Sequence, residues 1–435
     1  MKKVLVITYY WPPSGGGGVQ RWLKFVKYFR DQGWEPVVYT PLNPEMPSED
    51  VSLLAEIPDG IEVVKTKIWE PYLLYKRFIG KKKTQRINTG FLSDSKKPKT
   101  TENIAVWLRG NFFIPDARKF WIKPSIKFLK SYLKEHPVDA MVSTGPPHSM
   151  HMIALGIKKS LDIPWIADFR DPWTNIDFYH KLRLTKRGDR VHHQQEKQVI
   201  DHADVLTTVS WSWAEDFKQL GAKNVQVITN GFDPADYVDL AKTATLKFEL
   251  CHIGSMNKDR NPGKFWEALS LVAKKVEGFK DQLHIVLLGS TDHQVFEDLK
   301  RFGLMDQVEH FSYLPHKEVL ERASKASVLL LPLNDTPNVS GIIPGKIFEY
   351  LALQKPILAI GPDTGDSARI LRETNCGEIA GFDEVEKMAQ LIVDHYQNYL
   401  NPNNQKVKTG SIADYSRREL TKKMSSLLDS FQNQG

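Results

Sequence analysis

Short, uninterrupted apolar runs recur along this chain, and each ends in a loop rich in glycine or polar residues. Runs without polar alternation are typical of parallel strands covered by helices on both faces. Segments with apolar residues at helical spacing follow several runs, as in Val19, Trp22 and Val26. The pattern predicts parallel sheets made of strand–loop–helix units with right-handed crossovers. The expected strands cover residues 4–7, 36–40, 140–143, 164–168, 205–210, 225–228, 248–253, 285–288, 328–332 and 356–360.

The units fall into two groups, and 435 residues exceed what one ordinary hydrophobic core supports. We therefore predict an α/β protein with two Rossmann-like, doubly wound parallel-sheet domains, residues 1–235 and 245–410. A helical segment within residues 411–435 is expected to pack back on the first domain. Open parallel sheets bind ligands at the carboxyl ends of their strands, so we expect the site in a cleft between the facing domains.

The charge balance indicates an anionic partner. A net charge of +7 suits nucleotide sugars, phospholipid headgroups or nucleic acid. Nucleic acid is the least favoured, because the basic residues form no periodic recognition helix. The two cysteines make no disulfide framework, and the chain has no apolar run of about 20 residues and no signal-peptide core. We therefore expect a cytoplasmic protein.

A polar, glycine-containing loop runs into a predicted helix that carries Lys346 and Glu349 one turn apart. A helix N-terminus presents unpaired amide donors and partial positive charge, which suit a diphosphate. Lys346 would add a point charge, and the Glu349 carboxylate could accept two hydrogen bonds from a ribose diol. The alternative is an ordinary amphipathic helix with two solvated charges.

Four glycines, residues 15–18, separate the first predicted strand from the first helix. They match neither the dinucleotide fingerprint nor a Walker motif. Glycines do allow the backbone to approach a ligand closely and to turn its amides toward an anion. The run therefore predicts either a ligand contact or a flexible loop.

Taken together, these segments resemble glycosyltransferases of family 4, which have the two-domain GT-B architecture. The resemblance runs nearly end to end, and its most specific parts are Asn230-Gly-Phe-Asp233 and Pro344-Gly-Lys-Ile-Phe-Glu-Tyr-Leu-Ala352. It implies a sugar transferred from a nucleotide-diphosphate sugar, with retention of anomeric configuration and with neither a metal nor another cofactor. It also implies an acceptor that is a glycan or is linked to lipid, as in surface-polysaccharide synthesis.

The resemblance also assigns roles to residues. Arg260 and Lys346 would stabilise the departing diphosphate, and Glu349 would bind the ribose. The remaining donor contacts would come from Gly16, Gly17, Gly18, Gly254, Ile343 and Gly345. The chain departs from the family at two positions: Gly341 stands where a first glutamate is typical, and Ser255 stands where an arginine is typical. These departures leave the donor sugar open.

The first domain should hold the acceptor. Residues at predicted strand exits are the candidates, and His148 and Asp171 are the catalytic ones; the others are Asp168, Arg170 and, more weakly, Asp116. His148 could instead cap the next helix, and Arg170 could simply pair with Asp171.

Basic and apolar residues are mixed over residues 72–113, which could lie on the anionic inner face of a membrane or form a solvated loop. Two other classes of protein stay open on this scaffold: a nucleotide-sugar epimerase and a non-catalytic nucleotide-sugar-binding protein.

Overall fold

The computed structural model describes residues 1–46, 48–70, 100–176, 179–238, 245–401 and 411–431. Most of the predicted basic segment at 72–113 therefore lies outside the described residues. The chain divides into two compact units. Unit 1 contains residues 1–229 and 417–435, and unit 2 contains residues 230–416. Residues 230–235, predicted as part of the first domain, thus belong to unit 2, where the Phe232 amide donates to the Tyr415 carbonyl oxygen at 3.2 Å.

Unit 1 is built on a parallel sheet in the order β3-β2-β1-β4-β5-β6-β7. Its strands are β1 (Lys2–Ile7), β2 (Trp34–Pro41), β3 (Glu62–Thr66), β4 (Ala140–Gly145), β5 (Trp165–Phe169), β6 (Val205–Thr208) and β7 (Val225–Val227). Its helices are α1 (Gly17–Phe29), α3 (Thr100–Phe112), α4 (Lys119–Glu135), α5 (Ser149–Leu161), α6 (Lys186–His202), α7 (Trp211–Gln219) and α15 (Arg417–Ser430), with short turns η1 (Arg30–Gln32), η2 (Val51–Glu56) and η3 (Tyr179–Leu182).

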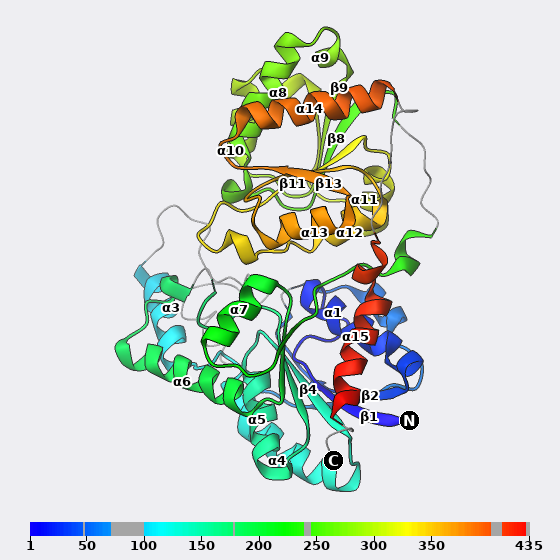
Figure 1. The fold of residues 1–435 in the computed structure, drawn as a ribbon. Coiled ribbons are helices and arrows are strands. Elements are labelled where there is room, and N and C mark those ends of the chain that lie inside the picture. Colours follow the sequence, from blue (N-terminus) through cyan, green and yellow to red (C-terminus); the bar gives the residue numbers. More distant parts are fainter. Residues whose placement is uncertain (47, 71–99, 177–178, 239–244, 402–410, 432–435) are drawn as a thin grey trace. The chain divides into compact units, whose positions relative to one another are not determined.

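Both faces of this sheet are apolar, as the uninterrupted runs predict. Leu5 and Ile7 of β1 pack in the core beneath α4 and α5, while Val4 and Val6 pack in the core beneath α1 and α15. Figure 1 shows these two helical layers on opposite sides of the strands. The C-terminal helix α15 packs along α1 and buries Leu420, Met424 and Leu428 there.

Unit 2 repeats the plan with the strand order β10-β9-β8-β11-β12-β13. Its strands are β8 (Phe248–Ile253), β9 (Leu283–Leu288), β10 (Val308–Phe311), β11 (Val328–Pro332), β12 (Ile357–Ile360) and β13 (Gly377–Ala380). Its helices are α8 (Gly263–Lys275), α9 (Phe279–Gln282), α10 (His293–Arg301), α11 (His316–Ala323), α12 (Lys346–Leu353), α13 (Asp366–Thr374) and α14 (Val385–Leu400), with turns η4 (Pro234–Tyr237), η5 (Lys258–Arg260), η6 (Met305–Gln307), η7 (Val339–Gly341) and η9 (Ala413–Tyr415).

Figure 1 shows α8 and α14 on one face of the second sheet and α12 and α13 on the other. The strand order reverses between β1 and β4 in unit 1, and between β8 and β11 in unit 2. At such a reversal, neighbouring loops leave toward opposite faces and open a crevice at the strand ends. The segments after β8 and β11 in unit 2, and after β1 and β4 in unit 1, are therefore where ligand-binding residues belong.

Candidate active site

Two cations meet at the carboxyl end of β8. Arg260 Nη1 donates to the Ser255 carbonyl oxygen at 2.8 Å, and Lys346 Nζ donates to the same oxygen at 3.3 Å. Gly254 makes this approach possible, because a Cβ there would lie 2.7 Å from Lys346 Cε. Its φ of 87° also falls in the left-handed region that favours glycine. Ser255 stands where an arginine is typical of the family, and the Arg260 guanidinium lies against its carbonyl oxygen.

Neither cation forms an ion pair with a carboxylate among the described residues. Burial lowers the pKa of Arg260, whose guanidinium still carries its charge. Burial, followed by the charge of Arg260, lowers the pKa of Lys346 to about 7. Two adjacent positive groups that repel each other in a partly buried place are well suited to an anion that would neutralise both.

His252 orients Lys346, a role that the sequence did not suggest. Its Nδ1 lies 2.9 Å from the Leu330 carbonyl oxygen, so that nitrogen carries the proton. The other ring nitrogen, Nε2, is then an acceptor and lies 3.3 Å from Lys346 Nζ. Burial, and then the charge of Lys346, hold the pKa of His252 well below its usual value, so the ring stays neutral. No local pattern in the sequence pointed to this role, because the two residues are 94 positions apart.

The helix α12 begins at Lys346, with Gly345 at its N-cap. Space around Gly345 is open, since a Cβ there would meet nothing within 4 Å. Ile343 is buried in the loop that leads to the helix. Glu349, one turn into α12, is partly exposed, and its Oε1 lies 3.6 Å from Nε2 of His316 on α11. Gly254, Arg260, Lys346, Gly345 and Glu349 thus surround one end of the unit 2 sheet.

Gly341, where the family has a glutamate, is buried in the turn η7. Two hydrogen bonds hold the turn and the segment after it: the Gly341 amide donates to the Asn338 carbonyl oxygen at 3.2 Å, and the Ser367 side-chain Oγ donates to the Ile342 carbonyl oxygen at 2.8 Å. The loop is therefore ordered without any carboxylate at this position.

The glycine run of unit 1 forms the start of α1. Gly16 has a φ of 100° and occupies the N-cap, and α1 begins at Gly17. A Cβ on Gly18 would overlap the Arg170 guanidinium, so a glycine at 18 lets Arg170 lie against the helix N-terminus. The run therefore forms the start of a helix beside a cation.

His148 lies at the end of β4 and at the N-cap of α5, but its side chain makes no capping hydrogen bond. Its ring is stacked on Trp173, with ring centroids 4.6 Å apart and planes 3° apart. Burial, and then the neighbouring His151, lower the pKa of His148 well below its usual value. The ring is therefore a neutral hydrogen-bonding group at pH 7.

Asp116 supplies the cap that His148 does not. Its Oδ2 accepts from the Ser149 amide at 2.8 Å, and its Oδ1 accepts from the Arg118 amide at 2.8 Å. Asp116 thus joins the starts of two helices, α4 and α5. This contact gives Asp116 a structural role and removes the reason to count it among acceptor residues.

Asp168 was a candidate for the acceptor site, and that prediction is wrong. The carboxylate is fully buried and accepts from Arg21 Nη2 at 2.8 Å and from Trp22 Nε1 at 2.8 Å. The Arg21 guanidinium is also fully buried. Every group around Asp168 belongs to the core of unit 1, so this carboxylate has no access to a ligand.

Asp171, three residues further on, is exposed to solvent, whereas Asp168 is buried. Its side chain is 38% exposed, and Oδ2 lies 3.6 Å from Arg170 Nε. Arg170 also donates from Nη2 to the Pro146 carbonyl oxygen at 3.1 Å. His148, Arg170 and Asp171 therefore sit at the adjacent ends of β4 and β5.

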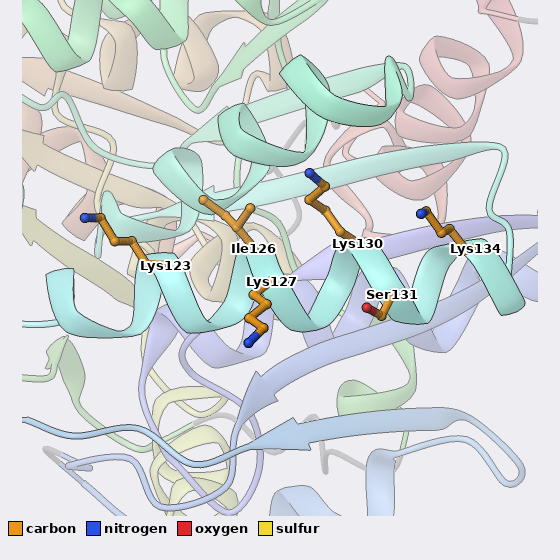
Figure 2. A pocket seen from close by; sticks show the side chains of 6 residues that line it. All are labelled: Lys123, Ile126, Lys127, Lys130, Ser131 and Lys134. Atoms are coloured by element: carbon orange, nitrogen blue, oxygen red, sulfur yellow. The ribbon is translucent and has the colours of Figure 1, made fainter.

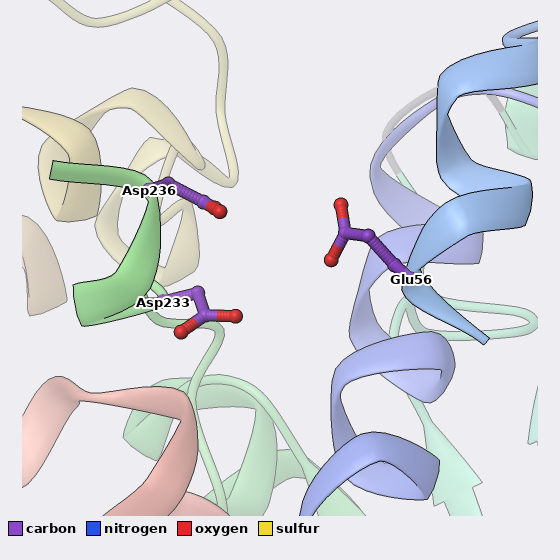
Figure 3. Close-up of side chains that lie close together, drawn as sticks. All are labelled: Glu56, Asp233 and Asp236. Carbon is purple, nitrogen blue, oxygen red and sulfur yellow. The ribbon is translucent and has the colours of Figure 1, made fainter. Parts of the chain in front are cut away.

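Figure 3 draws three carboxylates: Glu56 at the end of η2, Asp236 in η4, and Asp233 at the N-cap of η4. Glu56 is paired with Lys24 inside unit 1. Asp233 caps η4 inside unit 2, where its Oδ1 accepts from the Ala235 amide at 3.2 Å. Since both have a role within their own unit, we do not interpret the three as a metal centre.

Two family models match this chain. The model described as Glycosyltransferase Family 4 matches residues 89–236, and the model described as Glycosyl transferases group 1 matches residues 247–398. Together with the two doubly wound sheets, these matches define the chain as a glycosyltransferase of the GT-B type. It is a family 4-like glycosyltransferase, which confirms the fold and enzyme class expected from the sequence.

Solved structures share the fold over the whole chain at low identity. Sucrose-phosphate synthase from Thermosynechococcus elongatus is 11% identical, with a TM-score of 0.57 and coverage of 100% of each chain. WaaG, a glycosyltransferase involved in lipopolysaccharide biosynthesis, is 14% identical, with a TM-score of 0.54 and coverage of 98% of this chain and 99% of its own. HepE from Anabaena, solved in complex with UDP-glucose, is 13% identical, with a TM-score of 0.59 and coverage of 99% and 100%. No curated protein matched by sequence.

Proposed function

We propose that this protein transfers a sugar from a nucleotide-diphosphate sugar to a glycan or lipid-linked acceptor in surface-polysaccharide synthesis. The proposal includes retention of anomeric configuration and no required metal or other cofactor. The observation that carries it is the convergence of Arg260 and Lys346 on the Ser255 carbonyl oxygen. A structural neighbour, HepE, binds UDP-glucose, which supports a nucleotide sugar as the donor.

The donor would lie at the carboxyl end of the unit 2 sheet. Its diphosphate would be bound by Arg260, Lys346 and the first turn of α12, where amide donors and partial positive charge collect. Negative charge grows on the leaving diphosphate oxygen during transfer, and fixed cations stabilise that charge. Glu349, one turn along α12, would accept hydrogen bonds from the ribose hydroxyls.

The acceptor would be bound in unit 1. Neutral His148 and the exposed carboxylate of Asp171 are the groups available to hydrogen-bond a sugar hydroxyl. The start of α1 at Gly16, Gly17 and Gly18 supports an anion contact from this unit, since Arg170 lies against it.

The expected location is cytoplasmic, with the acceptor presented at a membrane. None of the described helices has the length and hydropathy needed to cross a bilayer.

A panel of nucleotide sugars tests the proposal. The UDP, GDP, ADP and dTDP sugars are compared by thermal shift, because a ligand that binds the folded state raises its melting temperature. The sugar that binds is then incubated with candidate acceptors, with and without a chelator, and the anomeric configuration of the product is read by NMR. Interconversion of the donor sugar without any acceptor would indicate an epimerase. Binding of a nucleotide sugar without any cleavage of the nucleotide from the sugar would indicate a non-catalytic protein.

Glu349→Ala should mainly weaken donor binding. A hydrogen bond to a charged group contributes about 1.5–3 kcal/mol, so the Kd of the donor should rise about 10-fold to 100-fold. Turnover at saturating donor should change much less. Calorimetric titration with the donor checks this, with Glu321→Ala on α11 as an exposed-glutamate control. An unchanged Kd would overturn the ribose assignment.

Donor binding should weaken as the pH rises above 7. The pKa of Lys346 is about 7 in the free protein, lowered by burial and by Arg260. An anionic diphosphate favours the protonated amine, so binding takes up a proton above that pH. The affinity should then fall by up to about tenfold per pH unit. Titrations at pH 8 in buffers of different ionisation enthalpy measure the uptake, and Lys346→Arg, which stays charged, should abolish it. Equal donor affinity at pH 6 and pH 8 would contradict the predicted role of Lys346 protonation in donor binding.

A further inference from the structure

We propose that Trp173 is a positioning residue, which holds the His148 imidazole in the plane in which it meets the acceptor. This role rests on the proposed function, in which His148 is an acceptor-binding group. Trp173 lies in the segment Asp171-Pro-Trp173, which follows β5. One short segment therefore carries an exposed acceptor candidate, Asp171, and a buried tryptophan two residues later.

The His148 ring is not oriented by a hydrogen bond at Nδ1. This nitrogen is buried and has no hydrogen-bond partner among the described residues, and the side chain does not cap α5. Histidines that meet a substrate through one ring nitrogen are usually oriented by a hydrogen bond to the other. Nδ1 of His148 instead lies against Gly145, where a Cβ would be only 2.9 Å away. Packing therefore sets the direction of this ring.

The Trp173 indole makes the flattest contact with that ring. The two ring centroids lie 4.6 Å apart and the ring planes are 3° apart. The rings of His151 and Phe169 also lie near His148, but they are tilted by 32° and 33°. Trp173 is 3% exposed, so its indole supports His148 and does not meet an acceptor itself. Turning the imidazole out of its plane would separate the two stacked faces.

His192 on α6 holds the indole in its turn. His192 Nε2 lies 3.2 Å from the Gly110 carbonyl oxygen, which can only accept, so Nε2 carries the proton. Nδ1 of His192 is then an acceptor, and Trp173 Nε1 donates to it at 3.1 Å. Burial lowers the pKa of His192, so the ring is neutral at pH 7 and Nδ1 keeps its lone pair.

Glu196, one turn further along α6, holds the next residue of the segment. Its Oε1 accepts from the Thr174 amide at 3.3 Å, and its Oε2 accepts from the Thr174 hydroxyl at 2.5 Å. Residues four apart on a helix lie on the same face, so His192 and Glu196 bind two consecutive residues from one side of α6. The support of His148 therefore runs from α6 through Trp173 to the acceptor side of the sheet.

NMR of isotope-labelled histidine tests the stack without any substrate. In the full chain, the Cε1–H signal of His148 is identified by its loss in His148→Asn. In the native protein this signal should lie upfield, because the indole ring current shields a ring stacked on its face. Trp173→Leu should shift it to the range of an unstacked histidine. A native signal already in that range, or one that Trp173→Leu leaves in place, would overturn the proposal.

Transfer kinetics test the consequence for the acceptor. Trp173→Leu should lower kcat/KM for the acceptor about 10-fold to 100-fold, because a small misplacement of a group that meets a substrate can cost that much. Trp173→Phe keeps a flat face and should lose less. The Kd of the donor should stay within about twofold of native, since distant sites act independently and the donor is assigned to unit 2. A native kcat/KM in Trp173→Leu, or an equal loss of donor affinity, would contradict the positioning role.

Failure of the proposed function gives a different result. A native protein that transfers no sugar to any acceptor would end the proposed function, whereas the His148 signal would still report whether Trp173 holds the ring.

Trp121 on α4, the helix drawn in Figure 2, offers a matched control. It is also buried, its ring is stacked on Tyr39 at 5.0 Å and 4°, and its Nε1 donates to Thr66 Oγ1 at 2.9 Å. Trp121→Leu thus removes the same kind of stack and hydrogen bond from unit 1, and it should leave kcat/KM for the acceptor within about twofold of native. Equal losses in Trp121→Leu and Trp173→Leu, at similar melting temperatures, would mean general destabilisation and would overturn the proposal.

Two substitutions of His192 test the outer contact. His192→Gln keeps a donor and an acceptor and should retain most of the acceptor kcat/KM, whereas His192→Leu should lose about 3-fold to 10-fold, as expected for one hydrogen bond. In a Trp173→Phe protein, which lacks the indole N–H, His192→Leu should add no further loss. A further loss would mean that His192 acts by another route and would remove it from this support.

Discussion

Arg260→Ala and Lys346→Ala should each lower the turnover number about 100-fold or more, because removing one preformed donor to a developing negative charge costs about that much. Both side chains already point at one place, since they donate to the same Ser255 carbonyl oxygen. Neither has to move far or lose a carboxylate partner to reach a diphosphate. The expected loss should therefore appear in turnover at saturating donor, measured as release of the nucleoside diphosphate.

Lys258→Ala is the matched control for this pair. Lys258 lies in the same turn, η5, as Arg260, but it is exposed. Its removal changes the local charge equally and should change turnover by less than about twofold, since exposed charges act weakly at a distance. Near-native turnover in Arg260→Ala or Lys346→Ala proteins with native melting temperatures would remove that residue from the mechanism.

The two sheets were predictable because their central strands are buried on both faces. Strands such as β1 and β11 therefore contain uninterrupted apolar runs in the sequence. Strands β3, β10 and β13 were not predicted. All three are edge strands of four or five residues and are only partly buried, so charged residues interrupt their sequences. Apolar runs report burial, so they missed three of the four edge strands, while the fourth, β7, was still predicted from Val225, Val227 and Ile228.

The cationic end of unit 2 was predictable for a different reason. Gly254 follows a strand directly, and Arg260 and Lys346 each stand beside a strand end or a helix start, so local sequence already restricts where they can lie. The contact of His252 with Lys346 joins residues 94 positions apart, and no local pattern reports it. The same holds for Asp168 and Arg21, which are 147 positions apart. An isolated aspartate at a strand end gives the same signal whether it faces a ligand or a buried arginine.

Asp168→Asn should destabilise unit 1 by about 3–5 kcal/mol, because breaking a buried ion pair leaves an uncompensated charge in the core. Arg21 would keep its charged guanidinium in a fully buried place, where the asparagine oxygen offers an acceptor but no negative charge. The two carboxylate oxygens also accept from Thr144 and Thr207, and asparagine keeps only one oxygen, so β5 loses an acceptor toward β4 or β6. Denaturant unfolding measures the loss, with tryptophan fluorescence as the probe.

Asp171→Asn supplies the control, since an exposed carboxylate 3.6 Å from its partner should contribute less than about 1 kcal/mol to folding.

The pH dependence of the free energy of unfolding gives an independent check. Burial alone would raise the pKa of Asp168, but Arg21 and the surrounding hydrogen bonds outweigh it and lower the pKa below its usual value. A carboxylate of this kind stabilises the folded state above the unfolded pKa of about 3.9, and that stabilisation is lost as the pH falls through the lower folded value. The native protein should thus lose stability below about pH 4, and the Asp168→Asn protein should lose less over that range. A variant as stable as native, or one with the same acid profile, would mean that the Arg21 charge is compensated elsewhere and that this pair does not hold the sheet of unit 1 together.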